Sequence, residues 1–125
     1  MSDLYKKMEI LNEKKKDNII KDIMDIPIEV INNKLAVSST QAQNLREYAT
    51  RTDSIEEILL YIKYQCVREG KMKNAGNKLE DLIDKKYRND GIEAIRFMLG
   101  VFARHVKIKE SGIKKPDNEP KGDSK

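Results

Sequence analysis

The sequence contains a single cysteine, a single histidine and no tryptophan. Because Cys66 has no cysteine partner, an internal disulfide and a multi-cysteine metal site are excluded, and a reducing, cytoplasmic location is the simplest expectation. His105 lacks a second histidine or a cysteine with which to bind a metal, and we expect it to be a half-buried structural residue. The sequence therefore predicts no metal and no cofactor.

Long apolar runs and nucleotide-binding motifs are also missing. No apolar run approaches the roughly 18 residues of a membrane span, and the N-terminus lacks the apolar core of a signal peptide. Neither GxxxxGK[ST] nor GxGxxG occurs. Paired acids such as Glu56 and Glu57 fall at expected helix starts, where they suit the helix dipole. These absences favour a binding or assembly module over an enzyme, with no catalytic residues and no membrane partner.

Charge, in contrast, is abundant and unevenly placed. The chain carries 25 basic and 21 acidic residues, a net charge of +4. Between residues 63 and 109 the basic residues exceed the acidic ones by six. A local basic excess favours a polyanion such as nucleic acid as partner. The alternative is a solvated basic surface without a partner.

The composition favours helix over sheet. Only three prolines occur, and Leu, Ile, Lys, Glu and Met are frequent. Hydrophobic residues make up 38% of the 125 residues, enough for one domain with a modest core. We predict an all-α fold: a compact bundle of about five helices over residues 1–109, followed by a disordered tail over residues 110–125, where large apolar residues almost disappear.

The helix positions follow from apolar spacing and from helix-ending residues. We place the helices at residues 2–24, 40–51, 55–69, 78–88 and 91–109. The first helix is expected to break near residues 16–18 and to end before Pro27. Residues 28–33 are expected to form a short helical turn, and residues 70–77 a flexible basic connector.

The helix at residues 91–109 is the most apolar segment and shows three faces on a helical wheel. A broad apolar face is expected to pack on the core; it consists of Ile92, Ile95, Leu99, Phe102, Ala103 and Val106. A basic stripe runs along one flank, with Gly100 as a gap between its side chains Arg96, Arg104 and Lys107. Asp90 and Glu93 fit a capping box at the helix start, as Ser38 and Gln41 do for the helix at 40–51.

A second, narrower apolar strip on the same helix consists of Phe97, Val101 and Ile108. A surface helix with one core to cover does not need it. The strip indicates either a deeply buried central helix or a contact surface for a partner subunit.

The helix at residues 55–69 combines a core face with an aromatic and basic face. The core face consists of Ile55, Ile58, Leu59, Ile62 and Cys66, so Cys66 is expected to act as a small buried hydrophobe. The opposite face carries Tyr61, Tyr64, Arg68 and, just beyond, Lys71, with Lys63 at its border. Aromatic residues among cations are typical of single-stranded nucleic-acid grooves. The alternative is that the tyrosines are half-buried with their hydroxyls in water.

Three stretches, in this order, resemble the small helical subunit of the type III-A CRISPR effector, the Csm complex. They are LAVSSTQAQNL (35–45), ILLYIKYQCVREGK (58–71) and KLEDLIDKKYRNDGIEAIRFMLGVFARHVK (78–107). The third stretch ends in a pattern of the family that Phe102, Ala103, His105 and Lys107 match. Lys63 and Lys71 match basic positions of the family. The chain departs from the family at Gln43, with Arg46 one turn later, and at Gln65 and Val106, where the family has basic residues.

The resemblance implies a non-catalytic subunit whose copies stack head to tail and hold the guide RNA and its target single-stranded RNA, while a neighbouring subunit cleaves. Together with the basic stripe it indicates seven RNA-binding residues: Arg46, Lys63, Arg68, Lys71, Arg96, Arg104 and Lys107. We expect the positive side chains of the two longest predicted helices to converge into one track. The strip Phe97, Val101 and Ile108 would then contact neighbouring copies or other subunits. The alternatives are the small subunit of a type III-B complex and a free-standing helical DNA-binding regulator.

Overall fold

A computed structural model describes the backbone of residues 11–123 and the side chains of residues 11–113. Five α-helices make up most of it: α2 (Glu13–Met24), α3 (Ser39–Thr50), α4 (Ile55–Arg68), α5 (Lys73–Asp81) and α6 (Ile92–Asp123). Three short turns of helix flank α5: η1 (Gly70–Met72), η2 (Leu82–Tyr87) and η3 (Arg88–Asp90). A small hairpin, β1 (Val30–Ile31) and β2 (Lys34–Leu35), connects α2 to α3. The prediction of an all-α bundle of about five helices is confirmed.

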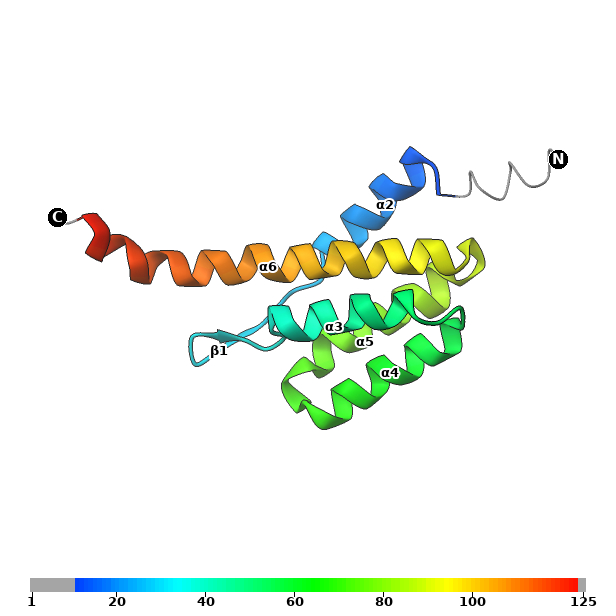
Figure 1. Cartoon of the computed structure of the whole chain (residues 1–125), viewed down its shortest axis with the longest axis horizontal. Helices are drawn as coiled ribbons and strands as arrows, with labels where there is room; N and C mark the ends of the chain where they lie inside the picture. The colour runs from blue at the N-terminus through cyan, green and yellow to red at the C-terminus, as the bar shows by residue number, and fades with distance from the viewer. Residues whose placement is uncertain (1–10, 124–125) are drawn as a thin grey trace.

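The long helix α6 is the axis around which the other helices are arranged. Figure 1 shows α2 on one side of α6, and α3, α4 and α5 on the other, with α4 at the edge farthest from α6. Helices α3 and α4 form a hairpin across residues 51–54. Within residues 11–123, no helix is both long and apolar enough to cross a membrane.

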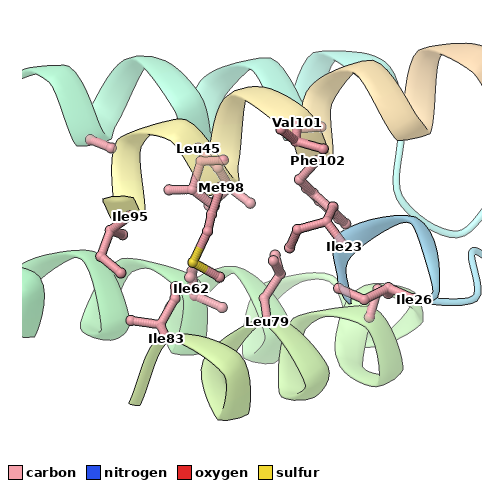
Figure 2. Packing of buried hydrophobic residues seen from close by; sticks show 14 of the residues in the cluster. Ile23, Ile26, Leu45, Ile62, Leu79, Ile83, Ile95, Met98, Val101 and Phe102 are labelled. Atoms are coloured by element: carbon pink, nitrogen blue, oxygen red, sulfur yellow. The ribbon is translucent and has the colours of Figure 1, made fainter. Parts of the chain in front are cut away.

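The core lies between α6 and the α4–α5 layer. Figure 2 shows buried side chains from several helices meeting there. Among them are Ile95, Met98 and Phe102 from α6, Leu45 from α3, Ile62 from α4, Leu79 from α5, Ile83 from η2 and Ile23 from α2. The core-facing positions predicted for the last helix are buried or half-buried as expected. Burial of this broad apolar face holds α6 in the centre of the bundle.

The helices with clear capping signals begin and end within about one residue of their predicted places. Ser38 and Gln41 form the predicted capping box, with their reciprocal hydrogen bonds at 3.0 and 2.9 Å. Ser54 caps α4 by accepting a hydrogen bond from the Glu57 amide at 3.1 Å. These side chains satisfy amide groups that the first turn of a helix leaves unpaired, which fixes where each helix begins.

The first described helix differs from its prediction at its start and in its continuity. The Asn12 side chain accepts a hydrogen bond from the Lys15 amide at 2.9 Å and so begins α2 at Glu13. The helix continues without interruption to Met24, so the predicted break near residues 16–18 is wrong. The predicted portion at residues 2–10 lies outside the described residues.

The helical turn predicted for residues 28–33 is wrong, because this segment enters the β-hairpin. Asn32 and Asn33 both adopt positive φ, 54° and 65°. A two-residue turn with positive φ at both positions matches the twist of paired strands, and asparagine tolerates this left-handed conformation better than most residues. The two asparagines therefore form the tip of a hairpin and not the end of a helix.

The flexible connector predicted for residues 70–77 is helical instead, forming η1 and the start of α5. Gly76 is buried, and a Cβ atom added there would lie 2.2 Å from the Sγ atom of Cys66 on α4. The glycine is thus required for the close approach of α5 to α4. Cys66, predicted to be buried, is half-buried and packs against the core, and its burial raises the pKa of its thiol.

Helix α6 begins later and ends later than predicted. It starts at Ile92, after Gly91 with a φ of 93°, and Asp90 pairs with Lys15 at 3.2 Å, so the capping box of Asp90 with Glu93 is wrong. The helix also continues past residue 109, and Glu110 accepts hydrogen bonds from the Ser39 hydroxyl. The prediction of a disordered tail is therefore wrong for residues 110–113, and the side chains of residues 114–125 lie outside the described part.

Two partly buried polar contacts attach η2 to α2. The Tyr87 hydroxyl donates to the Asp22 carboxylate at 2.5 Å, and the Lys86 ammonium pairs with the same oxygen at 2.7 Å. Burial acts to raise the pKa of Asp22, but the hydrogen bonds from Lys86 and Tyr87 outweigh it, so that the pKa lies below its usual value. Burial, together with Asp22, raises the pKa of Tyr87. The charged carboxylate is therefore the form that the fold stabilises.

We predict that Gly76→Ala lowers the free energy of unfolding by about 1–3 kcal/mol, because the added methyl group collides with the Cys66 sulfur. In a Cys66→Ala background the same substitution should instead raise stability by roughly 0.5–1 kcal/mol, the ordinary preference of a helix for alanine. Urea unfolding of the four chains measures both effects. Gly70→Ala, which meets nothing within 4 Å, is the control. A stabilising Gly76→Ala in the native background would contradict the close contact.

We predict that Asp22→Asn lowers the free energy of unfolding at pH 7 by about 1 kcal/mol, because the ionic partner of Tyr87 and Lys86 is lost. A carboxylate with a lowered folded-state pKa stabilises above its unfolded pKa, near 4, and loses this effect as the pH falls through the folded value. The difference between the two chains should therefore be smaller at pH 3 than at pH 7 in urea titrations. Asp17→Asn, on the exposed side of α2, should change stability little at either pH.

Candidate nucleic-acid interface

An open groove of about 470 Å³ lies between α3 and α6. Its lining comes from the polar side of α3 and from one flank of α6, and none of the lining residues is acidic. These residues are Ser39, Thr40, Gln43, Asn44, Arg46, Gly100, Ala103, Arg104 and Lys107. The groove thus contains three of the seven residues predicted to bind RNA.

Arg46 and Arg104 face this groove from opposite helices, and both are exposed. A Cβ atom added at Gly100 would lie 3.7 Å from the Nε atom of Arg46, so the Arg46 side chain lies over the glycine gap in α6. Among residues 11–113, no carboxylate pairs with either guanidinium. Two guanidinium groups, each able to bind a phosphate in a bidentate fashion, are therefore free for an anion.

Lys107 adds a third positive charge at one end of the groove, but this charge is partly compensated. Its Nζ atom lies 3.5 Å from the Glu110 carboxylate, which also accepts a hydrogen bond from Ser39 at 3.0 Å. The link from Ser39 to Glu110 connects the start of α3 to α6. Lys107 is therefore a weaker candidate for an anion contact than the two arginines.

The polar residues of α3 that line the groove were not predicted. Thr40, Gln43 and Asn44 lie on the side of α3 opposite the buried face that contains Ala42, Leu45 and Ala49. A helical wheel of α3 could have identified this polar side. The wheel could not have shown that α6 lies beside it, because that depends on the tertiary packing.

Arg96 was predicted to bind RNA, but it is a structural clamp. Its guanidinium donates to the backbone carbonyls of Ala49 and Thr52, both at 2.9 Å. It also pairs with Asp53 at 2.9 Å and with Glu93 at 2.6 Å. Because these bonds occupy all its nitrogens, Arg96 holds the end of α3 against α6 and is not free to bind phosphate.

Lys63 was also predicted to bind RNA, but it lies on an acidic surface between α4 and α5. It pairs with Glu80 at 3.0 Å, and this hydrogen bond raises the pKa of Lys63. The groove that contains it, of about 460 Å³, has four acidic and two basic lining residues: Glu56, Glu80, Asp81 and Asp84 with Lys63 and Arg88. A phosphate would be repelled there unless the existing pairs were broken.

Arg68 and Lys71 lie apart from the groove between α3 and α6. Arg68 is exposed in the last turn of α4. Lys71 lines a separate groove of about 410 Å³ beside the hairpin, which it shares with Glu69 and Glu110. The prediction of a single track is therefore wrong: Arg46, Arg104 and Lys107 come together, and the other four predicted cations do not.

Of the two tyrosines predicted to form an aromatic face on α4, one packs within the domain and the other is exposed. Tyr61 stacks on Tyr48 of α3, with ring centroids 4.3 Å apart and planes inclined by 7°. This pair joins α3 to α4. For Tyr61 it therefore agrees with the alternative that the tyrosines of this helix are half-buried and pack within the domain. Tyr64 is exposed and lies among other exposed side chains of α4.

The apolar strip predicted as a subunit interface on α6 is mostly covered within the chain. Val101 is only 5% exposed and belongs to the core. Phe97 is half-buried, with the Lys16 ammonium of α2 lying 5.7 Å from its ring centroid. Ile108 is 59% exposed. The interface prediction is therefore wrong for Val101, and the alternative of a deeply buried central helix holds there.

His105 is fully buried and lies deeper than expected. Its Nε2 atom is 2.7 Å from the carbonyl oxygen of Ile26, a distance at which the ring N–H donates to the carbonyl. The histidine thus attaches α6 to the segment after α2 and offers no accessible base. Within the described part of the chain, no group of three or more His, Cys, Asp or Glu residues could hold a metal ion.

We predict that Arg96→Ala lowers the free energy of unfolding by about 2 kcal/mol, because two backbone carbonyls lose their charged donor. Arg104→Ala removes the same charge from the same helix and should change stability by less than about 0.5 kcal/mol. Thermal and urea unfolding compare the two. Equal losses of stability would show that Arg96 is no more structural than Arg104.

The groove between α3 and α6 therefore offers anion binding through Arg46 and Arg104, with hydroxyl and amide groups alongside. No protein-family model, curated protein or solved structure matches the chain.

Proposed function

We propose that this chain is a non-catalytic RNA-binding subunit that holds the RNA backbone in the groove between α3 and α6. The observation that carries the proposal is the pair Arg46 and Arg104, which face one open groove without a carboxylate partner in the described part of the chain. Free cations that converge from two helices supply the phosphate contacts on which nucleic-acid affinity depends.

The other lining residues favour the backbone of RNA as the ligand. Ser39 and Thr40 carry hydroxyls, and Gln43 and Asn44 carry amides, along the same side of α3. Such groups donate to phosphate oxygens and both donate to and accept from the ribose 2′-hydroxyl, which distinguishes RNA from DNA. Contacts of this kind carry little sequence information, so unrelated RNA sequences should bind with similar affinity.

The resemblance to the small subunit of the type III-A CRISPR effector gives this activity a biological setting. Two of the three resembling stretches, residues 35–45 and 78–107, contribute lining residues to the groove, and Arg46 follows the first directly. We propose that the ligand is guide RNA paired with target RNA, and that the subunit assembles in the cytoplasm with other subunits and with copies of itself. The type III-B small subunit is the closest alternative.

We predict that Arg46→Ala combined with Arg104→Ala weakens the binding of single-stranded RNA about ten-fold or more at 0.1 M salt. The slope of log Kd against log salt should fall by about 1.4, since each lost contact to a single strand contributes roughly 0.7. Fluorescence anisotropy with two unrelated RNA sequences and one DNA duplex measures the affinity and the slope.

Lys63→Ala combined with Lys85→Ala is the matched control, because it removes the same charge from cations that already pair with carboxylates. This control should leave the salt slope nearly unchanged. An equal loss in both double variants would mean that net charge and not the groove determines binding. Tighter binding of the DNA duplex than of RNA would favour the DNA-binding regulator. Copurification of the tagged chain with the subunits of a type III effector tests the assembly separately.

A further inference from the structure

The outer face of α4 carries an uncovered apolar strip, which we call the α4 strip: Leu60, Tyr64 and Val67. Their exposed fractions are 66%, 57% and 84%, and their i, i+4, i+7 spacing places them in one row. No residue of the described part covers this row. Single exposed apolar residues are ordinary, but a row of three large ones on a chain with 37% charged residues marks a contact surface.

The strip lies where a second molecule can reach it. Helix α4 is at the edge of the bundle farthest from α6 (Figure 1). Its inner face, with Ile58 and Ile62, packs in the core, and Tyr61 stacks on α3, so that the helix is already held by its own domain. A contact on the outer face therefore requires no rearrangement of the fold.

The charges at the two ends of the strip are of opposite sign. Glu56 and Glu57 lie in the first turn of α4, and both are exposed. Arg68 lies in the last turn and Lys71 follows it; both are exposed. Part of the Glu56 charge is compensated by Arg88, at 2.6 Å, but the Glu56 side chain remains 74% exposed. The surface is thus acidic at one end, apolar in the middle and basic at the other end.

We propose that the α4 strip packs against the α4 strip of a second copy of this chain, with the two helices antiparallel about a two-fold axis. An isologous contact needs a surface that is complementary to itself, and in the antiparallel arrangement the acidic end of each helix meets the basic end of the other. A parallel pairing would place like charges together at both ends and is disfavoured.

The small size of the strip determines the strength of this contact. Three apolar side chains from each copy bury much less than the roughly 800 Å² per partner of a standard stable interface. The dimer is therefore weak and forms at high protein concentration. None of the three strip residues lines the groove with Arg46 and Arg104, so that both grooves remain open in the dimer.

The proposed dimer does not depend on the proposed RNA binding. Sedimentation velocity of the full chain from about 10 µM to 1 mM tests whether the chain dimerises. The native chain should show a weight-average mass that rises with concentration, and Val67→Glu should remain a monomer throughout. Ile108→Glu, a matched change at the exposed apolar residue of α6, should associate as the native chain does. RNA affinity, measured at 1 µM protein, should be the same for all three chains. The test of the dimer can therefore fail or succeed independently of the test of RNA binding in the groove.

A charge exchange tests the antiparallel orientation. One variant carries Glu56→Lys and Glu57→Lys, and the other carries Arg68→Glu and Lys71→Glu, so that each alone should associate at least ten-fold more weakly than the native chain. An equimolar mixture should recover association, because every end then meets an opposite charge, and this recovery shows that the separate variants are weakened by charge and not by misfolding. Circular dichroism checks that each variant is helical.

A monomeric native chain at 1 mM, or unchanged association of Val67→Glu, would overturn the proposal, and either result decides independently of the charge variants. Association that Ile108→Glu abolishes would place the interface on α6 instead. Charge variants that each associate as strongly as the native chain would exclude the antiparallel arrangement, because only an antiparallel pair brings opposite charges together in the native chain.

Discussion

The close packing of α3 against α6 is the constraint on which the rest of the structure depends. Small residues permit it, since Ala42 and Ala49 are fully buried on the side of α3 that packs in the core. Polar contacts then fix both ends, since Arg96 holds the carbonyl groups at the end of α3 and Ser39 donates to Glu110 at its start. The groove with Arg46 and Arg104 exists because these two helices are held side by side.

The sequence predicted the elements whose signals are local and missed those that depend on tertiary packing. The start of α3 follows from Ser38 and Gln41, which act on the first turn of their own helix. Gly76, in contrast, reads as a flexible connector residue because its neighbours are polar. In the fold it is the point where α5 touches Cys66, and no local pattern in the sequence contains that information. Asn32 and Asn33 likewise fit a helix end and a hairpin tip equally well until the paired strands are known.

The candidate site was predicted only in part for a similar reason. A wheel of α6 correctly placed Arg96 and Arg104 on one flank, but it could not show that Arg96 reaches the end of α3. Nor could it show that Glu80 lies beside Lys63, because the two residues are on different helices. A count of cations overestimates a phosphate-binding surface whenever carboxylates from other helices neutralise some of them. Which cations remain free is a property of the fold.

The distinction between free and paired cations also determines which surface of this molecule would bind phosphate more strongly. At Lys63, a phosphate must displace Glu80 and approach three further carboxylates. At Arg46 and Arg104 it displaces only water and counterions, so that release of these ions favours binding there. The α3–α4 hairpin thus has two different sides: α3 borders the groove, while the outer face of α4 points away from it. The proposed RNA contact and the proposed contact with a second copy therefore use different helices of the hairpin, and neither covers the side chains of the other.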